Sequence, residues 1–404
     1  MRRRGAWMGM VWAAALGCDL EPGGDEGAAG DSGGSVDPPG ASDDSSGSAG
    51  SPTSVGSGTS GTSESSGADE PAPPSDGTFV SDGIATSDFG VAADGSVVLV
   101  GKPVLVDQWA VMVQCFAPDA TPFDAQAIAE YIPEETSVLT DIRTDRSAAG
   151  NFAVSWWVVP SEGDFQTMVA FFDADCELVH GPEHIDPEVP SDATSWDATI
   201  RATDNGDFYM VYDRNAPQRL VRYGADGTFI QGRSLMPCSG PAMGLGVSRA
   251  NANSVVFCQE GQGRTYRRFD AELEPVDADW LAVPNAGQPG NNHAAAVMND
   301  DGAFAYISRR GDDGHHALVF DPDGALVAEL DDPFTVAANP FSWVTPDGDF
   351  LFQVGGDGVA PLTLLSPQGQ TLAVQYEYYA MKTDPAGNRY ARLGYDVLRN
   401  PPTP

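Results

Sequence analysis

One pattern of turns and short apolar runs is repeated along this sequence, and the repetition constrains the fold more than any other feature. In its clearest copy, the turn 204–207 precedes the apolar run 208–212, and a second run, 220–223, leads through the turn 225–227 into residues 228–230. Five to eight β-branched or aromatic residues bounded by Asp, Asn and Gly are typical of strands, and the Gly supplies the positive φ that a tight turn needs. The copy therefore predicts a strand, a loop, a second strand, a tight turn and a third strand.

Both halves of this unit recur along the chain. The first half, a turn glycine followed by an apolar strand, recurs at Gly95, Gly150, Gly206, Gly302, Gly348 and Gly387, with a degenerate copy near Asn253. The second half, an aromatic residue or leucine followed by an Asp/Pro/Gly turn, begins at Phe116, Phe172, Tyr223, Phe269, Phe320 and Leu365. A period near 40 to 50 residues with about four strands is typical of a propeller blade. The sequence therefore predicts an all-β protein with a β-propeller fold.

The two ends of the repeat region determine the number of blades. Residues 381–393 begin a seventh unit and residues 395–398 supply a third strand, but the chain stops before a fourth. Residues 75–80 match residues 225–230 almost residue for residue. We therefore predict seven blades, with the N-terminal strand completing the last blade and removing an exposed sheet edge. Six blades with a loose C-terminal tail are the alternative.

Residues 1–17 have the features of a secretion signal. Three arginines, Arg2 to Arg4, precede the apolar run 5–16. This run is shorter than the roughly 20 residues that span a bilayer. Residues 15–18, Ala-Leu-Gly-Cys, resemble the lipobox of bacterial lipoproteins, although Ala15 stands where Leu is usual. The resemblance implies that Cys18 is acylated and that the protein is a membrane-anchored lipoprotein, periplasmic or at the cell surface; an ordinary signal peptide is the alternative.

Composition divides the rest of the chain into two parts. Residues 18–76 are almost entirely Gly, Ser, Asp, Glu, Pro, Ala and Thr after the cysteine. Such a segment buries too little apolar surface to offset its ordering entropy, so we predict a disordered tether that spans about 40 Å on average. Residues 77–404 carry the repeats without a break in composition, and we predict a single propeller domain there. The net charge of −37 repels phosphate backbones and disfavours nucleic-acid binding.

Four cysteines follow Cys18, and an even number in an exported chain favours disulfides. Cys238 precedes the fourth unit and Cys258 lies in its second strand, so this pair is the preferred bridge. Cys115 and Cys176 would then link adjacent blades, with free buried thiols as an equal alternative. There is no C-x-x-C motif, so the sequence does not predict a zinc site.

Motifs for metal binding and catalysis are weak. The acidic turns 173–175 and 321–324 share alternate carboxylates with calcium loops but lack the remaining EF-hand ligands. Turn formation is their main interpretation, although Ca²⁺ remains a possible cofactor. The histidine pairs at 180 and 184, in a Gly/Pro-rich connection, and at 315 and 316 do not have ligand spacing on a shared face. The repeat region, residues 77–404, contains no G-x-S-x-G nucleophile motif. We therefore predict no catalytic residue and no metal ligand.

The third unit resembles an NHL repeat. The matching positions are Gly206, Tyr209, Val211, Asp213, Asn215, Arg219, Leu220, Tyr223, Asp226, Gly227 and Phe229. The other units keep only the turn glycine and the terminal acidic turn, at which level they are also similar to WD40-like and quinoprotein-like propellers. NHL-like propellers serve in protein binding, RNA binding and metal-dependent lactone hydrolysis. The acidity of this chain argues against RNA, and the metal set of the lactonases cannot be placed on it.

These observations favour a lipid-anchored, extracytoplasmic, monomeric propeller that acts as a non-catalytic binding or scaffold module. Its expected partners are a protein or carbohydrate ligand at one propeller face and the membrane through the lipid, with no nucleic acid. Because aromatic residues and Arg dominate binding energies, the candidate contact residues are Trp157, Asp213, Arg214, His293, Arg309, Arg310 and Trp343. The alternative is a metal-dependent hydrolase or lyase acting on sugars or lactones, which requires Asp, Glu, Asn or His side chains to converge near the propeller axis.

Overall fold

The computed structural model describes most of the chain after residue 76. The described residues are 77–105, 109–132, 135–161, 164–189, 195–214, 218–236, 238, 242–260, 263–284, 289–310, 315–331, 341–353, 360–378 and 380–400. The chain divides into two units, residues 1–68 and 69–404, and every described residue belongs to the second. The expected signal peptide, Cys18 and the tether lie outside the described residues.

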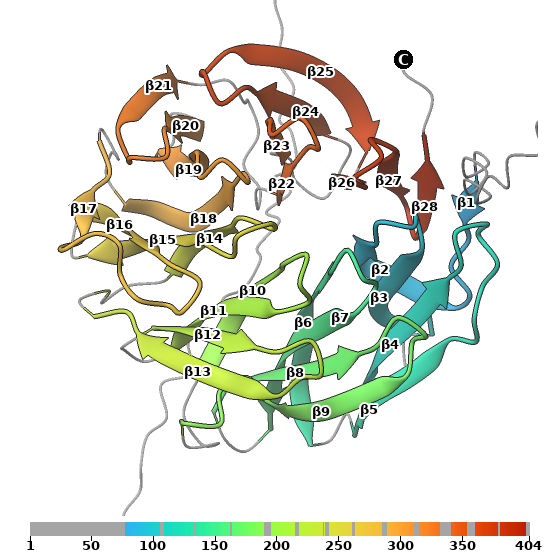
Figure 1. The fold of residues 1–404 in the computed structure, drawn as a ribbon. Coiled ribbons are helices and arrows are strands. Elements are labelled where there is room, and N and C mark those ends of the chain that lie inside the picture. Colours follow the sequence, from blue (N-terminus) through green and yellow to red (C-terminus); the bar gives the residue numbers. More distant parts are fainter. Residues whose placement is uncertain are drawn as a thin grey trace, which may run out of the picture. The chain divides into compact units, whose positions relative to one another are not determined.

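The described residues form seven antiparallel sheets of four strands each, arranged as blades around a ring (Figure 1). Blade 1 consists of β2 (Ile84–Val91), β3 (Val97–Pro103), β4 (Trp109–Phe116) and β5 (Gln126–Tyr131). Blade 2 consists of β6 (Thr136–Arg146), β7 (Phe152–Pro160), β8 (Gln166–Phe172) and β9 (Leu178–His184). Blade 3 consists of β10 (Ser195–Ala202), β11 (Phe208–Arg214), β12 (Arg219–Tyr223) and β13 (Phe229–Ser234). Blades 4 and 5 comprise β14 (Ala242–Val247), β15 (Ser254–Glu260), β16 (Gly263–Phe269) and β17 (Leu281–Ala282); and β18 (Pro289–Met298), β19 (Phe304–Arg310), β20 (His315–Phe320) and β21 (Leu326–Asp331). Blades 6 and 7 comprise β22 (Phe341–Val344), β23 (Phe350–Gln353), β24 (Ala360–Leu365) and β25 (Thr371–Tyr378); and β26 (Ala380–Thr383), β27 (Arg389–Leu393), β28 (Asp396–Arg399) and β1 (Thr78–Phe79).

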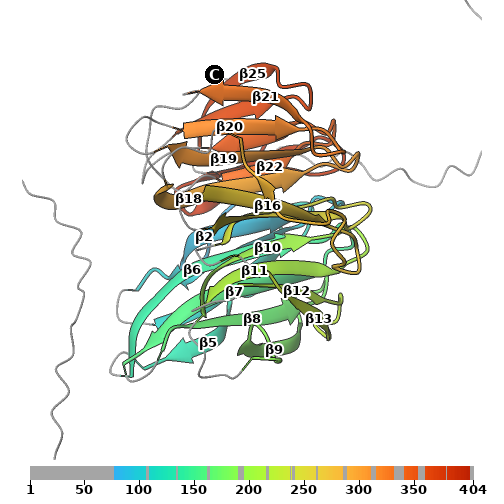
Figure 2. The ribbon, with the colours of Figure 1, turned by 90° about the vertical axis from the view of Figure 1, so that its left-hand side faces the viewer.

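In blades 1 to 6 the strands follow the order of the chain from the inside of the ring to the outside, whereas in blade 7 the outer strand is β1. Figure 2 shows this for blade 3, where β10, β11, β12 and β13 follow one another across the sheet. First strands of neighbouring blades, such as β2 with β6 and β14 with β18, lie against each other. They therefore form the inner wall of the ring. The segment 124–132 contains β5, which spans Gln126–Tyr131.

The last blade is closed by the N-terminal strand, as predicted. Thr78 pairs with Leu398 and Phe79 with Val397, so β1 is the outer strand of the sheet built by β26, β27 and β28. The Phe79 ring is fully buried, and its centroid lies 5.6 Å from the ring of Phe116 in blade 1. The prediction of seven blades is confirmed, and the six-blade alternative is wrong.

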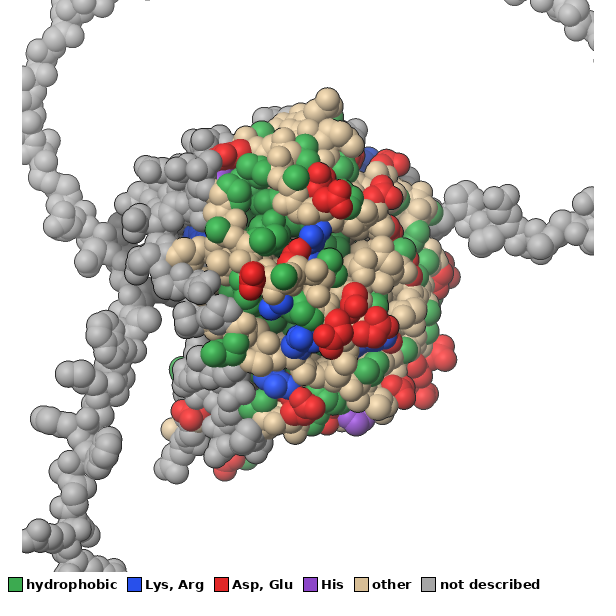
Figure 3. Space-filling view, turned by 60° about the vertical axis from the view of Figure 1, so that its left-hand side comes forward, with side chains coloured by type: hydrophobic (Ala, Val, Ile, Leu, Met, Phe, Trp, Pro, Cys, Tyr) green, Lys and Arg blue, Asp and Glu red, His purple; other side chains and the backbone are tan. Residues whose placement is uncertain are grey.

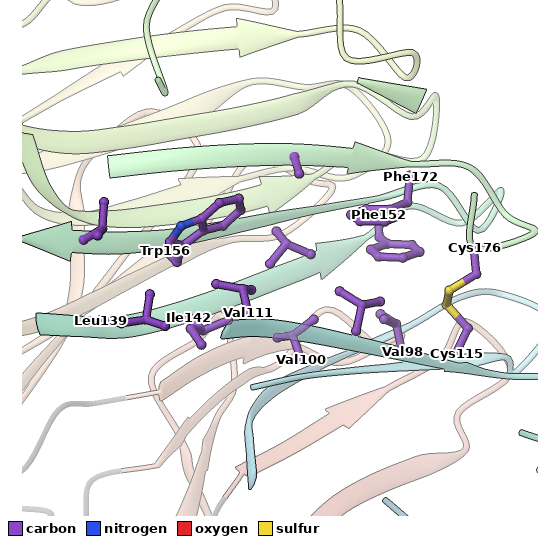
Figure 4. Packing of buried hydrophobic residues seen from close by; sticks show 14 residues of the cluster. Val98, Val100, Val111, Cys115, Leu139, Ile142, Phe152, Trp156, Phe172 and Cys176 are labelled. Carbon is purple, nitrogen blue, oxygen red and sulfur yellow. A yellow bond between two sulfur atoms is a disulfide. The ribbon is translucent and has the colours of Figure 1, made fainter. Parts of the chain in front are cut away.

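Apolar runs without alternation are explained by the stacking of blades. In β7, Phe152, Val154 and Trp156 pack in a core shared with blade 1, whereas Ala153 belongs to the core shared with blade 3. Figure 4 shows the first of these cores, with Val98 and Val100 of β3 facing Phe152 and Trp156. A strand between two sheets buries both of its faces, so both sets of side chains must be apolar.

The turn glycines of the repeat are required by backbone conformation. In six blades the turn between the first and second strand closes with an N–H to O=C bond across four residues, and its glycine has φ between 83° and 97°. Blade 4 is the exception, because Ser248 N–H bonds Asn253 O across five residues and Ala252 takes φ 62°. This extra residue explains why the sequence repeat is degenerate near Asn253.

The preferred bridge is present, since Cys238 is bonded to Cys258. Of the two alternatives for the other pair, the disulfide is found, since Cys115 of blade 1 is bonded to Cys176 of blade 2 (Figure 4). The alternative of free thiols at Cys115 and Cys176 is therefore wrong. Disulfides persist in oxidising compartments, so this pattern fits a domain that works outside the cytoplasm. The described part of the chain holds no helix that could cross a membrane.

Candidate functional site

The turns between the first and second strands surround one end of the ring axis. We call them the inner turns; they are residues 92–96, 147–151, 203–207, 248–253, 299–303, 345–349 and 384–388. Hydrogen bonds join several neighbours, including Ala93 N–H to Ala148 O at 3.3 Å and Asp204 N–H to Arg249 O at 2.8 Å. The inner turns therefore form a fixed rim built from the same position of every blade.

A cavity of about 340 Å³ opens inside this rim. We call it the channel mouth; it is lined by Val91, Ala93, Ala148, Asp204, Arg249, residues 298–301, residues 343–348 and residues 383–385. Every blade contributes, but blades 5, 6 and 7 supply most of the wall. The first strands of blades 6 and 7, β22 and β26, are four residues long, whereas those of blades 1 to 5 have six to eleven residues.

Arg249 crosses the channel mouth from the inner turn of blade 4. Its guanidinium carbon lies 5.4 Å from the ring centroid of Trp343 in blade 6. Its Nε lies 3.3 Å from Asp204 Oδ1, and its Nη2 donates to Arg146 O at 2.7 Å. The side chain therefore ties four blades together, and its positive charge is already paired.

Beneath the channel mouth, buried carboxylates connect neighbouring blades along the inner wall. Asp88 Oδ2 accepts a hydrogen bond from Thr144 N–H at 3.0 Å, and Asp145 Oδ2 accepts one from Ala202 N–H at 2.8 Å. Each bond joins the first strands of adjacent blades. A hydrogen bond from a backbone N–H satisfies a carboxylate oxygen that is buried away from water. These aspartates therefore have a structural role that explains their burial.

Two cations complete this layer. Lys382 Nζ lies 3.4 Å from Asp88 Oδ1 and 5.2 Å from the ring of Trp343. Arg201 Nη2 donates to Ser342 Oγ at 3.0 Å. Burial lowers the pKa of the Arg201 guanidinium, and the nearby Asp145 and Asp88 oppose this effect. Charges of both signs are therefore matched along the axis, below the more acidic mouth.

Metal-binding geometry is not found among the described residues, where no group of three or more His, Cys, Asp and Glu side chains could hold an ion. Residues 173–175 and 321–324 form turns, as predicted from the sequence. Asp173 Oδ1 accepts a hydrogen bond from Glu177 N–H at 2.9 Å, and Asp321 Oδ1 accepts one from Ala325 N–H at 2.8 Å. The expectation that His180 and His184 lie in a Gly/Pro-rich connection is wrong, because both residues belong to the outer strand β9.

The predicted contact residues fall at two opposite ends of the blades. Trp343 lines the channel mouth and is 7% exposed, and the charged groups of Arg249 and Lys382 lie near its ring. The half-buried Trp157 lies in β7, where its ring is 5.2 Å from Phe165. The remaining positions lie at strand ends away from the inner turns: Asp213 and Arg214 end β11, Arg309 and Arg310 end β19, and His293 is in the first half of β18. The side chains of these five residues lie outside the described part of the chain.

Sequence reasoning missed most residues of the channel mouth. Asp204, Asp300, Asp301 and Asp347 each stand one or two positions before a turn glycine. The local pattern at these positions indicates only a turn. Because the repeat places this position at the axis in every blade, an alignment of the units was the signal that could have brought them together.

Seven four-stranded sheets in a ring closed by both chain ends define a seven-bladed β-propeller. No protein-family model matches the sequence, and no curated protein does. Among solved structures, the chain is similar to the β-propeller domain of Cps50 (Swd1) from Myceliophteria thermophila, with 9% identity, a TM-score of 0.49 and coverage of 80% of this chain and 98% of that one. It is also similar to the Dos1 propeller, with 10% identity, a TM-score of 0.46 and coverage of 80% and 93%. These similarities concern the fold alone.

Proposed function

We propose that this protein is an extracytoplasmic, lipid-anchored β-propeller that acts as a non-catalytic binding module and receives its ligand at the channel mouth. The observation that carries the proposal is a cavity on the ring axis to which every blade contributes. Ligand sites are usually concave, with apolar walls and a few convergent polar groups. The channel mouth combines Met298, Trp343 and Val344 with the carboxylates of the inner turns on a rigid scaffold.

The compartment and anchor in this proposal have separate support. The disulfides Cys115–Cys176 and Cys238–Cys258 fit an oxidising environment. The resemblance of residues 15–18 to a lipobox supports acylation of Cys18. Multiple acyl chains anchor a protein stably where a single chain does not.

A ligand survey with a blocked variant tests the binding site. The full chain is screened by thermal shift against amino acids, short peptides, sugars and lactones. Pro346→Trp places a bulky ring at the channel mouth, and Val276→Trp, on an exposed position of blade 4, is the control. We expect a ligand that raises the melting temperature of the wild type and of the control but not of Pro346→Trp, because the ring fills its site.

Two outcomes would contradict the proposal. Chemical conversion of a bound sugar or lactone would favour the hydrolase alternative. A ligand whose effect survives Pro346→Trp but is lost in a variant of Arg214 or Arg310 would place recognition at the opposite ends of the blades, where β11 and β19 end. That surface, with Trp157, Asp213, His293 and Arg309, is the second candidate contact region.

A further inference from the structure

We propose that the channel mouth recognises an ammonium or guanidinium group, such as a Lys or Arg side chain presented by an extended protein segment or the amine of a small molecule. This inference rests on the proposed binding function and names the ligand class. Asp204, Asp300, Asp301, Asp347 and Asp384 line the cavity. Among the described residues of the lining, Arg249 is the one basic side chain, and none is a lysine or histidine.

The charge of Arg249 is not available to an anion. Its guanidinium contacts Asp204 and the Arg146 carbonyl and lies over Trp343. Asp301 and Asp347, by contrast, are exposed at the rim, on the inner turns of blades 5 and 6. Uncompensated carboxylates around a cavity repel an anionic ligand and attract a cationic one.

A second observation, independent of the carboxylates, also points to a ligand that carries hydrogen-bond donors. Asn299 lines the cavity and is only 2% exposed. Its Nδ2 donates to Gly348 O at 3.1 Å, whereas its Oδ1 is buried without a hydrogen-bond partner. Thr383 Oγ1, in the wall contributed by blade 7, is likewise unpaired. A buried acceptor without a donor is costly, and a ligand that carries hydrogen-bond donors would relieve this cost.

The apolar part of the wall fits the stem of such a group. Met298, Val344 and Pro346 lie beside the aspartates in the same cavity. Lys and Arg side chains bury an aliphatic stem against apolar surface while their charged ends reach polar groups. A small hydrated metal ion would use the carboxylates but not this apolar wall. The combination therefore favours an organic cation.

Peptide and amine probes test the ligand class. Binding of acetyl-Gly-Arg-Gly-amide, its citrulline counterpart and spermidine to the full chain is measured by calorimetry. We expect the arginine peptide to bind at least about tenfold more tightly than the neutral citrulline peptide, and its affinity to fall with added salt because the contacts are electrostatic. Binding of spermidine alone would assign the site to free amines, and binding of the peptide alone would assign it to a protein side chain.

Charge-matched variants locate the contact. Asp301→Asn combined with Asp347→Asn is expected to weaken cation binding about tenfold or more. The control, Asp175→Asn with Asp323→Asn, removes the same charge from exposed turns between third and fourth strands and should change affinity less than about twofold. Both variants alter exposed residues, so unchanged circular dichroism and melting temperatures are expected.

The inference is overturned if arginine and citrulline peptides bind equally, if no cationic probe binds, or if both double variants behave alike. A neutral ligand whose thermal shift is abolished by Pro346→Trp would leave the binding function standing and refute only the cationic class. A survey without any ligand that depends on the channel mouth would refute both.

Discussion

Single side chains hold this ring together at positions where two blades meet. Asp88 and Asp145 act between first strands, and Arg249 acts across the channel mouth. Phe79 has the same role at the point of closure. Its ring contacts Phe116 of blade 1 and lies 6.1 Å from the ring of Tyr390 in blade 7. The guanidinium carbon of Arg399 lies 5.2 Å from the centroid of the Phe79 ring.

Phe79→Ala therefore tests closure at the scale of one residue. A fully buried phenylalanine truncated to alanine costs about 3 to 5 kcal/mol in the free energy of unfolding. We expect a loss in this range in urea denaturation, together with faster amide exchange in β28, the strand that pairs with β1. The control is Val80→Ala, because Val80 is 60% exposed and should change stability by less than about 0.5 kcal/mol. A loss below about 1 kcal/mol for Phe79→Ala would show that β1 does not secure the ring.

Elements far apart in sequence are linked through the turns between third and fourth strands, which we call the outer turns. Gln126 Nε2 of blade 1 donates to Cys176 O in the outer turn of blade 2 at 2.8 Å. Tyr209 Oη of blade 3 donates to Ala271 O in that of blade 4 at 2.8 Å, and Tyr266 Oη of blade 4 donates to Gly324 O in that of blade 5 at 2.9 Å. Each of these three outer turns thus receives a donor from the preceding blade. The Cys115–Cys176 disulfide adds a covalent link at the same place.

The two disulfides differ in what they constrain. Cys115–Cys176 joins residues 61 positions apart and couples two blades, whereas Cys238–Cys258 spans 20 positions inside blade 4. In the chain-entropy account the longer loop stabilises by about 4 kcal/mol and the shorter by about 3 kcal/mol. We expect Cys115→Ala with Cys176→Ala to lower the urea midpoint more than Cys238→Ala with Cys258→Ala. An equal or reversed order would mean that native packing, and not loop length, decides their contributions.

The fold could be predicted at the scale of elements because the turn glycines are set by local backbone conformation. Gly95, Gly206 and Gly348 need positive φ whatever surrounds them, so their spacing reports the blade period. The candidate site could not be predicted in this way. Whether Asp301 and Asp347 share a cavity depends on the lengths of β22 and β26 and on the packing of the blades. A local sequence pattern predicts neither of these two properties. The prediction from turn glycines also has a limit within the fold itself. In blade 4 the non-glycine residue Ala252 takes the position of the turn glycine, so this repeat is hard to recognise in the sequence.

On the scale of the whole molecule, few cations face many carboxylates. The chain has 21 Lys and Arg against 58 Asp and Glu. Several of these cations are used inside the ring, where Arg201, Arg249 and Lys382 lie along the axis. Acidic side chains are prominent on the face seen in Figure 3, with basic ones among them. The surface is therefore more acidic than the interior, and a net charge far from zero favours solubility.

The proposed lipid anchor would hold this acidic ring at a membrane through the thiol sulfur of Cys18. If residues 15–18 act as a lipobox, cleavage before Cys18 exposes the amine that is acylated. We expect mass spectrometry of the membrane fraction to find an N-terminal Cys18 peptide that carries acyl chains. Because each buried CH₂ contributes about 0.8 kcal/mol to membrane binding, Cys18→Ser should move the protein from the membrane to the soluble fraction.

Cys115→Ala with Cys176→Ala is the control, because it removes two cysteines but leaves Cys18 intact. A Cys18→Ser protein that stays in the membrane fraction, or an unmodified mature N-terminus that begins elsewhere, would contradict lipid anchoring and favour an ordinary signal peptide.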